Sequence, residues 1–400
     1  MSARIIAVSA LHDFIPLYPL YQLFFSDHGL SAAQISLLFV IWSATGFVLE
    51  VPSGAWADAY SRRKLLILGA LISGLGYAAW ITLPSFAGFA LGFVLWGASS
   101  ALISGTYEAF VYDELAARGR AEHYPTLLGR ARSAALVTNL AATVVAAPLF
   151  DLGGYMLAGM VSVLSCLVEA FVAWTLPESR PVESAREADE PGAKAALANY
   201  VHMLRTGVSE VLTSRVVRRA VLLVALLGGF LGFDEYFPLL ARETGAATGA
   251  IPLLIAGTVA AQAIGGALAG PLYRLRAATF AGGLAVTAVL IAVGALSGSP
   301  WGFLPIAIGY GVLQLVIVVS EARLQDAITG PARATVTSVS GLFAEVSAIA
   351  VYAGFAVGSV WFTMSILVAG LTIPVLLTAF VVPASLPAPR SSAAAEASEP

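Results

Sequence analysis

Long apolar runs separated by short polar stretches make up most of the chain. Twelve of these runs reach the roughly 20 apolar residues that an α-helix needs to cross the hydrocarbon core of a bilayer. They are residues 4–25, 33–57, 64–83, 86–112, 127–149, 153–176, 217–241, 250–271, 277–297, 301–323, 335–357 and 360–382. None of them alternates apolar and polar residues as a strand of a membrane barrel does. The pattern predicts an all-α membrane protein with twelve transmembrane helices.

The first apolar run has the length and the leading positive charge of a secretory signal sequence. Its centre holds His12 and Asp13, and it shows no small-residue cleavage site. We therefore interpret it as a span that the mature protein retains.

The composition excludes a soluble protein. Apolar residues make up 58% of the 400 residues and charged residues only 11%, against roughly 25% in soluble proteins. So few charges cannot cover the surface of a soluble fold. The net charge of −3 gives no reason to expect a nucleic-acid partner. A single cysteine, Cys166, excludes a disulfide framework and a cysteine-built metal site, and we expect no metal and no cofactor.

The basic residues predict the orientation of the spans. If the N-terminus is cytoplasmic, 20 of the 21 Lys and Arg residues fall on inner segments, and only Arg242 lies outside. Positive residues concentrate on the cytoplasmic side of membrane proteins. We therefore predict a multi-pass protein of the cell membrane with both termini in the cytoplasm.

A charged, Pro-rich segment divides the twelve runs into two groups of six. We predict a six-helix bundle over residues 1–176, a cytoplasmic linker over 177–215, a second six-helix bundle over 216–383 and a disordered tail over 384–400. The second part of the linker has the pattern of a helix that lies on the membrane surface.

Two short sequence echoes indicate that the halves are repeats of each other. Asp13-Phe-Ile-Pro in the first span matches Glu235-Tyr-Phe-Pro in the seventh, and Glu108-Ala-Phe-Val-Tyr-Asp113 in the fourth matches Glu321-Ala-Arg-Leu-Gln-Asp326 in the tenth. Equivalent positions in two six-span halves favour an internal duplication. Pseudo-symmetric bundles around a central cavity are an architecture of transporters, with the substrate site near the middle of the membrane.

The connection between the second and third spans carries a motif. It reads Gly54-Ala-Trp-Ala-Asp58-Ala-Tyr-Ser-Arg62-Arg63-Lys64 and resembles the loop signature of the major facilitator superfamily, although Ala59 and Ser61 depart from it. The resemblance implies the major facilitator fold and a gating role for Gly54, Asp58, Arg62 and Arg63, because in this family the loop clasps the two halves. The alternative is that the basic residues only anchor the topology.

Two further segments resemble bacterial permeases of drug or metabolite efflux. These are Glu50-Val-Pro-Ser-Gly54 and residues 105–113. Two features of proton-antiporting drug exporters are missing, because residues 86–112 contain no Arg, and Thr143-Val-Val-Ala-Ala-Pro148 lacks the two glycines of the exporter signature. The direction of transport stays open at this point.

Carboxyl groups inside the predicted spans are the candidates for proton coupling, because an ionisable group in hydrocarbon is costly and usually functional. Asp13 lies nine residues after Arg4, which corresponds to about 14 Å along a helix and places it near the middle of the membrane. Glu345 lies about equally deep, and Asp234 and Glu235 lie further toward the outside.

Polar side chains on the first, second, fourth and tenth spans predict the wall of a substrate cavity, because the resemblance implies that these spans contact the central space. We assign to it Tyr18, Gln22, Glu50, Tyr107, Glu108, Tyr112, Tyr310, Gln314 and Glu321. Asp113, Arg130 and Arg132 are predicted to form ion pairs at the cytoplasmic end. The alternatives are that Glu108 pairs with Arg130 or Arg132, that Glu321 pairs with Arg333 and that His12 serves only as a partner of Asp13. Glu169 is left out, because the resemblance implies that the sixth span turns toward lipid and scaffold.

These observations predict a secondary transporter rather than an enzyme. No GxxxxGK[ST] phosphate loop of an ATP-driven pump occurs. We predict proton-antiport export of a small, partly hydrophobic drug or metabolite by a monomer, with protons and the lipid bilayer as its other partners. The alternative is a proton-coupled uptake symporter. Two remote alternatives are a membrane enzyme that uses His12 and Asp13 as an acid–base pair, and a receptor that does not transport.

Overall fold

The computed structural model describes residues 1–179, 205, 209, 211–328 and 333–389, and within them the side chains of all residues except 50–52, 54, 55, 57–59 and 333–335. Most of the predicted linker and tail lies outside this part of the chain. Internal contacts divide the chain into unit 1, Met1–Tyr200 with Thr248–Leu253, and unit 2, Val201–Ala247 with Leu254–Pro400. The described residues are almost entirely helical and contain no strand.

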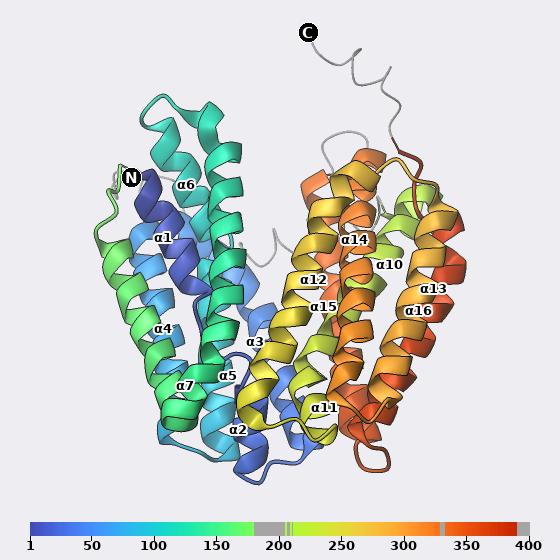
Figure 1. Ribbon diagram of the computed structural model, residues 1–400. Helices are drawn as coiled ribbons and strands as arrows, with labels where there is room; N and C mark the ends of the chain where they lie inside the picture. The colour runs from blue at the N-terminus through green and yellow to red at the C-terminus, as the bar shows by residue number, and fades with distance from the viewer. Residues whose placement is uncertain (180–204, 206–208, 210, 329–332, 390–400) are drawn as a thin grey trace. The chain divides into compact units, whose positions relative to one another are not determined.

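Unit 1 is a bundle of helices that pack on one another through small and apolar side chains. Its helices are α1 (Ser2–His12), α2 (Tyr21–Asp27), α3 (Ala32–Ala59), α4 (Arg62–Thr82), α5 (Phe86–Ile103), α6 (Thr106–Ala116) and α7 (Tyr124–Trp174), with a 3-10 turn, η1 (Ala121–His123), ahead of α7. Helix α7 packs against α1 and α4, and α5 packs against α3 and α4 (Figure 1).

Unit 2 is a second helical bundle. Its helices are α10 (Arg215–Phe230), α11 (Phe237–Glu243), α12 (Ile251–Leu272), α13 (Ala277–Leu296), α14 (Phe303–Ala327), α15 (Arg333–Gly358) and α16 (Met364–Ser385). The 3-10 turns η2 (Leu231–Tyr236), η3 (Thr248–Ala250) and η4 (Pro300–Gly302) precede α11, α12 and α14; η3 and the first residues of α12 belong to unit 1. Helix α13 packs against α14 and α16, and α10 packs against α15 and α14.

The first predicted span is not one helix. Helix α1 ends at His12, Asp13 is its C-cap, and regular helix resumes only at Tyr21 in α2. Pro16 and Pro19 fall in the interval, and a proline has no N–H to donate to a helix. The prediction of a continuous helix over 4–25 is therefore wrong. The break leaves Asp13 at a helix end inside the predicted membrane region.

The seventh predicted span is broken at the corresponding place. Helix α10 ends at Phe230, η2 carries Asp234 and Glu235, and α11 begins with Pro238 in its first turn. Proline is well tolerated in a first helical turn, since that N–H has no partner within the helix. The breaks place Asp13 and the Asp234–Glu235 pair at equivalent interruptions, as the sequence echo between the halves indicates.

Two glycines with positive φ mark two further interruptions, one inside the predicted fourth span and one close to the predicted boundary between the fifth and sixth spans. Gly105, with φ of 60°, separates α5 from α6 within the fourth span. Gly154, with φ of 61°, follows Gly153 in a turn inside α7, whose two arms run antiparallel, coloured teal and then green (Figure 1). Positive φ is accessible to glycine without the steric cost that a Cβ imposes.

The described part of the chain contains ten helices long and apolar enough to cross a membrane. The broken first span is not among them, and the two arms of α7 are counted together. Adding the broken first span and counting the two arms of α7 as two spans gives the twelve spans of the sequence prediction. Large apolar side chains such as Leu136, Val137 and Phe380 are exposed on the outer faces of the helices. Exposed apolar surface of this extent is typical of helices that face lipid.

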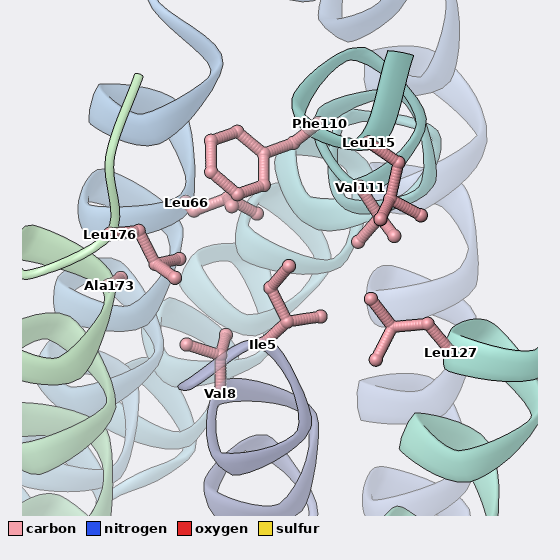
Figure 2. Packing of buried hydrophobic residues seen from close by; sticks show 9 residues of the cluster. All are labelled: Ile5, Val8, Leu66, Phe110, Val111, Leu115, Leu127, Ala173 and Leu176. Carbon is pink, nitrogen blue, oxygen red and sulfur yellow. The ribbon is translucent and has the colours of Figure 1, made fainter. Parts of the chain in front are cut away.

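Each unit has its own apolar core. In unit 1, residues from α1, α4, α6 and α7 meet close to the N-terminus, and Figure 2 shows Ile5 and Val8 of α1 facing Leu66, Phe110 and Leu127. In unit 2 a comparable cluster joins α10, α14 and α15 through Val217, Val221, Leu324 and Val339. The cluster in unit 1 anchors the first two turns of α1, and the last turn of this helix leads to the break at Asp13.

Candidate functional site

A group of ionisable side chains lies at the break of the first span. His12 Nδ1 is 3.2 Å from Oε1 of Glu169, which comes from the second arm of α7 and is 1% exposed. Asp13 is half-buried, and its charge acts on both His12 and Glu169. Ser165, one turn before Glu169, donates from Oγ to the Leu11 carbonyl at 2.9 Å and ties the two helices together beside this group.

A pocket of about 220 Å³ borders this group within unit 1. It is lined by Val8, Ser9 and His12 of α1, Ile103 of α5, Ser104 and Gly105 of the break, Tyr107 and Glu108 of α6, and Glu169. The glycine break between α5 and α6 thus forms one side of the pocket and the end of α1 the other. Two helix interruptions therefore bring polar groups to one cavity, as is typical of sites in transporters with discontinuous helices.

Tyr107 and Glu108, both predicted to line the substrate cavity, lie in this pocket. The Tyr107 hydroxyl donates to the Ile5 carbonyl at 2.8 Å. Glu108 Oε1 accepts from Arg132 Nη2 at 2.6 Å, so the alternative prediction of an ion pair with Arg132 is confirmed. Arg130 lies on the same arm of α7 with an exposed side chain. Tyr112 is exposed one turn further along α6 and contacts the ring of Tyr124.

A second polar network lies at the end of unit 1 where α4 begins. Arg62 Nη1 donates to Asp113 Oδ2 at 2.5 Å, so Asp113 pairs with Arg62 in α4 and not with Arg130 or Arg132. Arg63 Nε lies 3.6 Å from Glu178 Oε2, which also accepts from Ser61 Oγ at 2.7 Å. The positive pole of a helix dipole lies at its N-terminus, where basic residues are unfavourable, so these carboxylates offset the repulsion.

Two ion pairs of unit 1, Arg62–Asp113 and Arg132–Glu108, are expected to differ in their contribution to stability. Arg62 and Asp113 have side chains 13% and 34% exposed, whereas Arg132 and Glu108 are 69% and 46% exposed. Arg62→Ala should lower the free energy of unfolding by about 1.5 kcal/mol, and Arg132→Ala by no more than about 0.5 kcal/mol. Denaturant-induced unfolding in detergent measures both. Equal losses of unfolding free energy in the two variants would show that burial does not determine how much these ion pairs stabilise the protein.

In unit 2 the acidic residues of the seventh span gather around η2. Glu235 is 5% exposed and Asp234 is half-buried, and both act electrostatically on Tyr310 of α14. The Tyr310 hydroxyl donates to the Leu231 carbonyl at 2.6 Å and fastens η2 to α14. Three of the predicted site residues therefore come together here. Glu345, the remaining proton-coupling candidate, is half-buried on α15.

The other predicted cavity residues are scattered in the described structure. Gln314 is half-buried and Glu321 exposed on α14. Gln22 is 2% exposed on α2, and Tyr18 packs against the rings of Tyr21 and Trp96. Tyr18 therefore joins an aromatic layer of unit 1 and does not line the pocket beside Glu169. The side chains of four predicted or alternative site residues lie outside the described part of the chain: Glu50, Gly54, Asp58 and Arg333.

A larger, apolar cavity of about 520 Å³ lies in unit 2 between α10, α15 and α16. Its walls include Phe230, Val351, Phe355 and Leu371. The ring of Phe355 stacks on Tyr236 of η2 at 3.7 Å between centroids, so this cavity adjoins the break of the seventh span. Its lining carries one hydroxyl, that of Ser347, and no charged group.

Sequence reasoning missed three buried charged residues. Glu169 was left out together with the sixth span, and the structure places it buried against His12 beside the pocket. Glu114 is 1% exposed and accepts from Arg118 at 2.6 Å. Arg323 is 1% exposed, and its guanidinium donates to the carbonyls of Tyr273, Leu275 and Pro387. A charged residue inside an apolar run is the signal that could have found such a residue, and the sequence shows it at Glu169.

The described residues contain no group of three or more His, Cys, Asp or Glu side chains arranged to hold a metal ion. Cys166 is buried as a free thiol in α7.

The comparisons with known proteins agree with this architecture. A profile described as Major Facilitator Superfamily matches residues 5–351. No sequence of a curated protein matches the chain. Among solved structures, the nucleoside transporter NupG has a TM-score of 0.72 at 12% identity, over 95% of this chain and 98% of that chain. A bacterial homologue of the iron transporter ferroportin in its inward-facing state has a TM-score of 0.69 at 18% identity, over 95% of both chains.

A D-xylose–proton symporter also shares the fold, with a TM-score of 0.64 at 14% identity over 95% of both chains. A profile match over most of the chain shows the family: this chain belongs to the major facilitator superfamily. The sequence prediction of a twelve-helix major facilitator fold is confirmed. Its relatives by fold are transporters, and the family assigns it to secondary transport across a membrane.

Proposed function

We propose that this protein exports a small, partly hydrophobic compound across the cell membrane in exchange for protons. Asp13 carries the proton, and the pocket beside it receives the polar part of the compound. The acidic residues at the break of the seventh span, Asp234 and Glu235, are the second candidates. Gly54, Asp58, Arg62 and Arg63 form the gating connection, at the end predicted to be cytoplasmic.

One observation carries this proposal: the half-buried carboxyl of Asp13 at a helix break, next to the His12–Glu169 pair and the 220 Å³ pocket. No hydrogen bond to the Asp13 side chain occurs among the described residues, so its carboxyl group is available to take up and release a proton. Coupling ions in transporters bind where a spanning helix is interrupted. The apolar cavity in unit 2 supports the partly hydrophobic character of the compound.

Uptake by proton symport is the second candidate. The observation in its favour is the fold shared with a D-xylose–proton symporter. The same carboxyl groups serve either direction, because both mechanisms need a proton site next to a substrate site. Antiport and symport differ in the sign of the gradient that drives accumulation.

The two directions are distinguished in liposomes that contain the purified protein. The probes are a cation, a neutral compound and an anion: ethidium, N-phenylnaphthylamine and fluorescein. Proton antiport should accumulate a probe when the lumen is acidic, and proton symport when the lumen is alkaline. Protein-free liposomes and a protonophore are the controls. Transport that is the same with and without a pH gradient would contradict both proton antiport and proton symport.

A further inference from the structure

We propose that the pocket of unit 1 binds a protonated amine, with Glu169 as the group that accepts its hydrogen bond. This inference rests on the proposed function, since it names the chemical class of the compound that the Asp13 site exchanges for a proton. Glu169 is a binding residue in this proposal, and the amine is the cationic end of a larger, partly hydrophobic compound.

An unused acceptor at the pocket carries the inference. Glu169 is 1% exposed and lines the pocket, and only one of its carboxylate oxygens has a partner, the Oε1 that faces His12. The other oxygen, Oε2, is buried and has no hydrogen-bond partner among the described residues. A buried carboxylate oxygen without a partner is costly. A ligand that donates a hydrogen bond there removes this cost.

Two of the three hydroxyl groups that line the pocket, those of Ser9 and Tyr107, make the same selection. Ser9 Oγ donates to the Ala131 carbonyl at 3.2 Å, and the Tyr107 hydroxyl donates to the Ile5 carbonyl. Each hydroxyl has one hydrogen, so both face the pocket with acceptor lone pairs only. An ammonium group has three donors and no acceptor. These two hydroxyls and the free Glu169 oxygen favour an amine cation over a carboxylate or phosphate.

The charge balance of the pocket also favours a cationic ligand. Glu108, Glu169 and neighbouring Asp13 are three carboxyl groups, and they face His12 and, through Glu108, Arg132. With His12 protonated and all three carboxylates ionised, the group keeps one negative charge. Either a proton on Asp13 or a ligand cation cancels it. Exchange of one for the other keeps the site neutral, which is favourable in a low-dielectric environment.

The pocket volume limits what enters it. Cavities for drug-sized ligands measure roughly 300–1,000 Å³, whereas this pocket measures about 220 Å³. It therefore accommodates an amine head group, with the apolar body of the compound outside it. The lining by Val8 and Ile103 supplies apolar contact for the carbons next to the nitrogen.

Equilibrium binding to the purified full-length protein tests the proposal. The probes are 2-phenylethylamine, 2-phenylethanol and 3-phenylpropionate, which share a phenyl body and carry a positive, neutral or negative end at pH 7. We expect the amine to bind at least about ten-fold more tightly than the alcohol, since a hydrogen bond between charged groups is stronger than one between neutral groups. The carboxylate should bind most weakly.

Glu169→Gln should remove the preference for the amine and weaken its binding by about ten-fold or more. Glu122→Gln, an exposed carboxyl of unit 1 that also pairs with a histidine, His123, but lies outside the pocket, is the matched control and should change nothing. Ser104→Met fills the pocket without changing its charges and should also abolish amine binding, so the proposal stays testable if Glu169→Gln does not fold. Equal affinity for amine and alcohol, or unchanged affinity in both pocket variants, would overturn it.

The outcomes separate this inference from the proposed function. If the amine binds with the expected preference and yet no pH gradient drives flux, proton exchange fails and the pocket assignment stands. If a pH gradient drives transport of a neutral or anionic probe and the amine shows no preference, the pocket assignment alone fails.

Discussion

Replacing Asp13 with Asn is expected to abolish gradient-driven accumulation while leaving substrate binding and downhill exchange largely intact. Asn has nearly the same size and occupies the same C-cap, so the end of α1 should keep its geometry. It carries no proton, and the exchange of proton for substrate then loses its carrier. We expect accumulation against a gradient to fall by at least about 100-fold, which corresponds to a lost coupling free energy of about 2.7 kcal/mol.

The measurement compares uphill accumulation and equilibrium exchange of the same probe in liposomes. Asp151→Asn, the same chemical change at an exposed position near the turn of α7, is the matched control and should behave as the unaltered protein. If Asp13→Asn still concentrates the probe, the proton is carried elsewhere, and Glu235→Gln becomes the next variant to measure.

Replacing Arg323 with Ala is expected to destabilise unit 2 more than any other substitution considered above. The buried guanidinium donates to the carbonyls of Tyr273, Leu275 and Pro387 and lies over the rings of Tyr273 and Phe280. It joins the end of α14 to the turn between α12 and α13 and to the segment after α16. Its removal leaves three carbonyl acceptors without their donor.

We expect a loss of about 3 kcal/mol or more in the free energy of unfolding, because each lost charged hydrogen bond is worth roughly 1.5–3 kcal/mol and part of the cost is recovered by water. Thermal unfolding in detergent measures it. Arg274→Ala, at an exposed position between the same two helices, is the control and should change stability by less than about 0.5 kcal/mol. A small effect at Arg323 would mean that water replaces the guanidinium at low cost.

The spans were predictable because the bilayer imposes a length and a composition that can be counted along one chain. Each helix must satisfy its own backbone hydrogen bonds in lipid, so a run of about 20 apolar residues becomes a helix whatever surrounds it. The breaks were partly visible as well. Pro16 and Pro19 lie in the first, and the matching Asp13 and Glu235 echoes indicated where the two halves correspond.

The partners of the charged residues were not predictable to the same degree. Spacing along a helix links residues three or four positions apart, but His12 and Glu169 are 157 positions apart and Arg62 and Asp113 are 51 apart. The assumption that the sixth span faces lipid removed Glu169 from consideration. The packing of α7 against α1 and α4 determines which face of α7 is buried. A count of apolar residues along the chain does not show that face.

The sequence by itself therefore determined the class of the protein, its spans and its family, since these depend on composition, periodicity and a local motif. Only the tertiary structure decided which carboxyl groups are buried, which cations they meet and where a pocket forms. The physical reason is that the cost of burying a charge depends on all the groups around it. Those groups come together through the interruptions at Asp13 and Gly105 and the turn at Gly154, which bring distant helices to a single cavity.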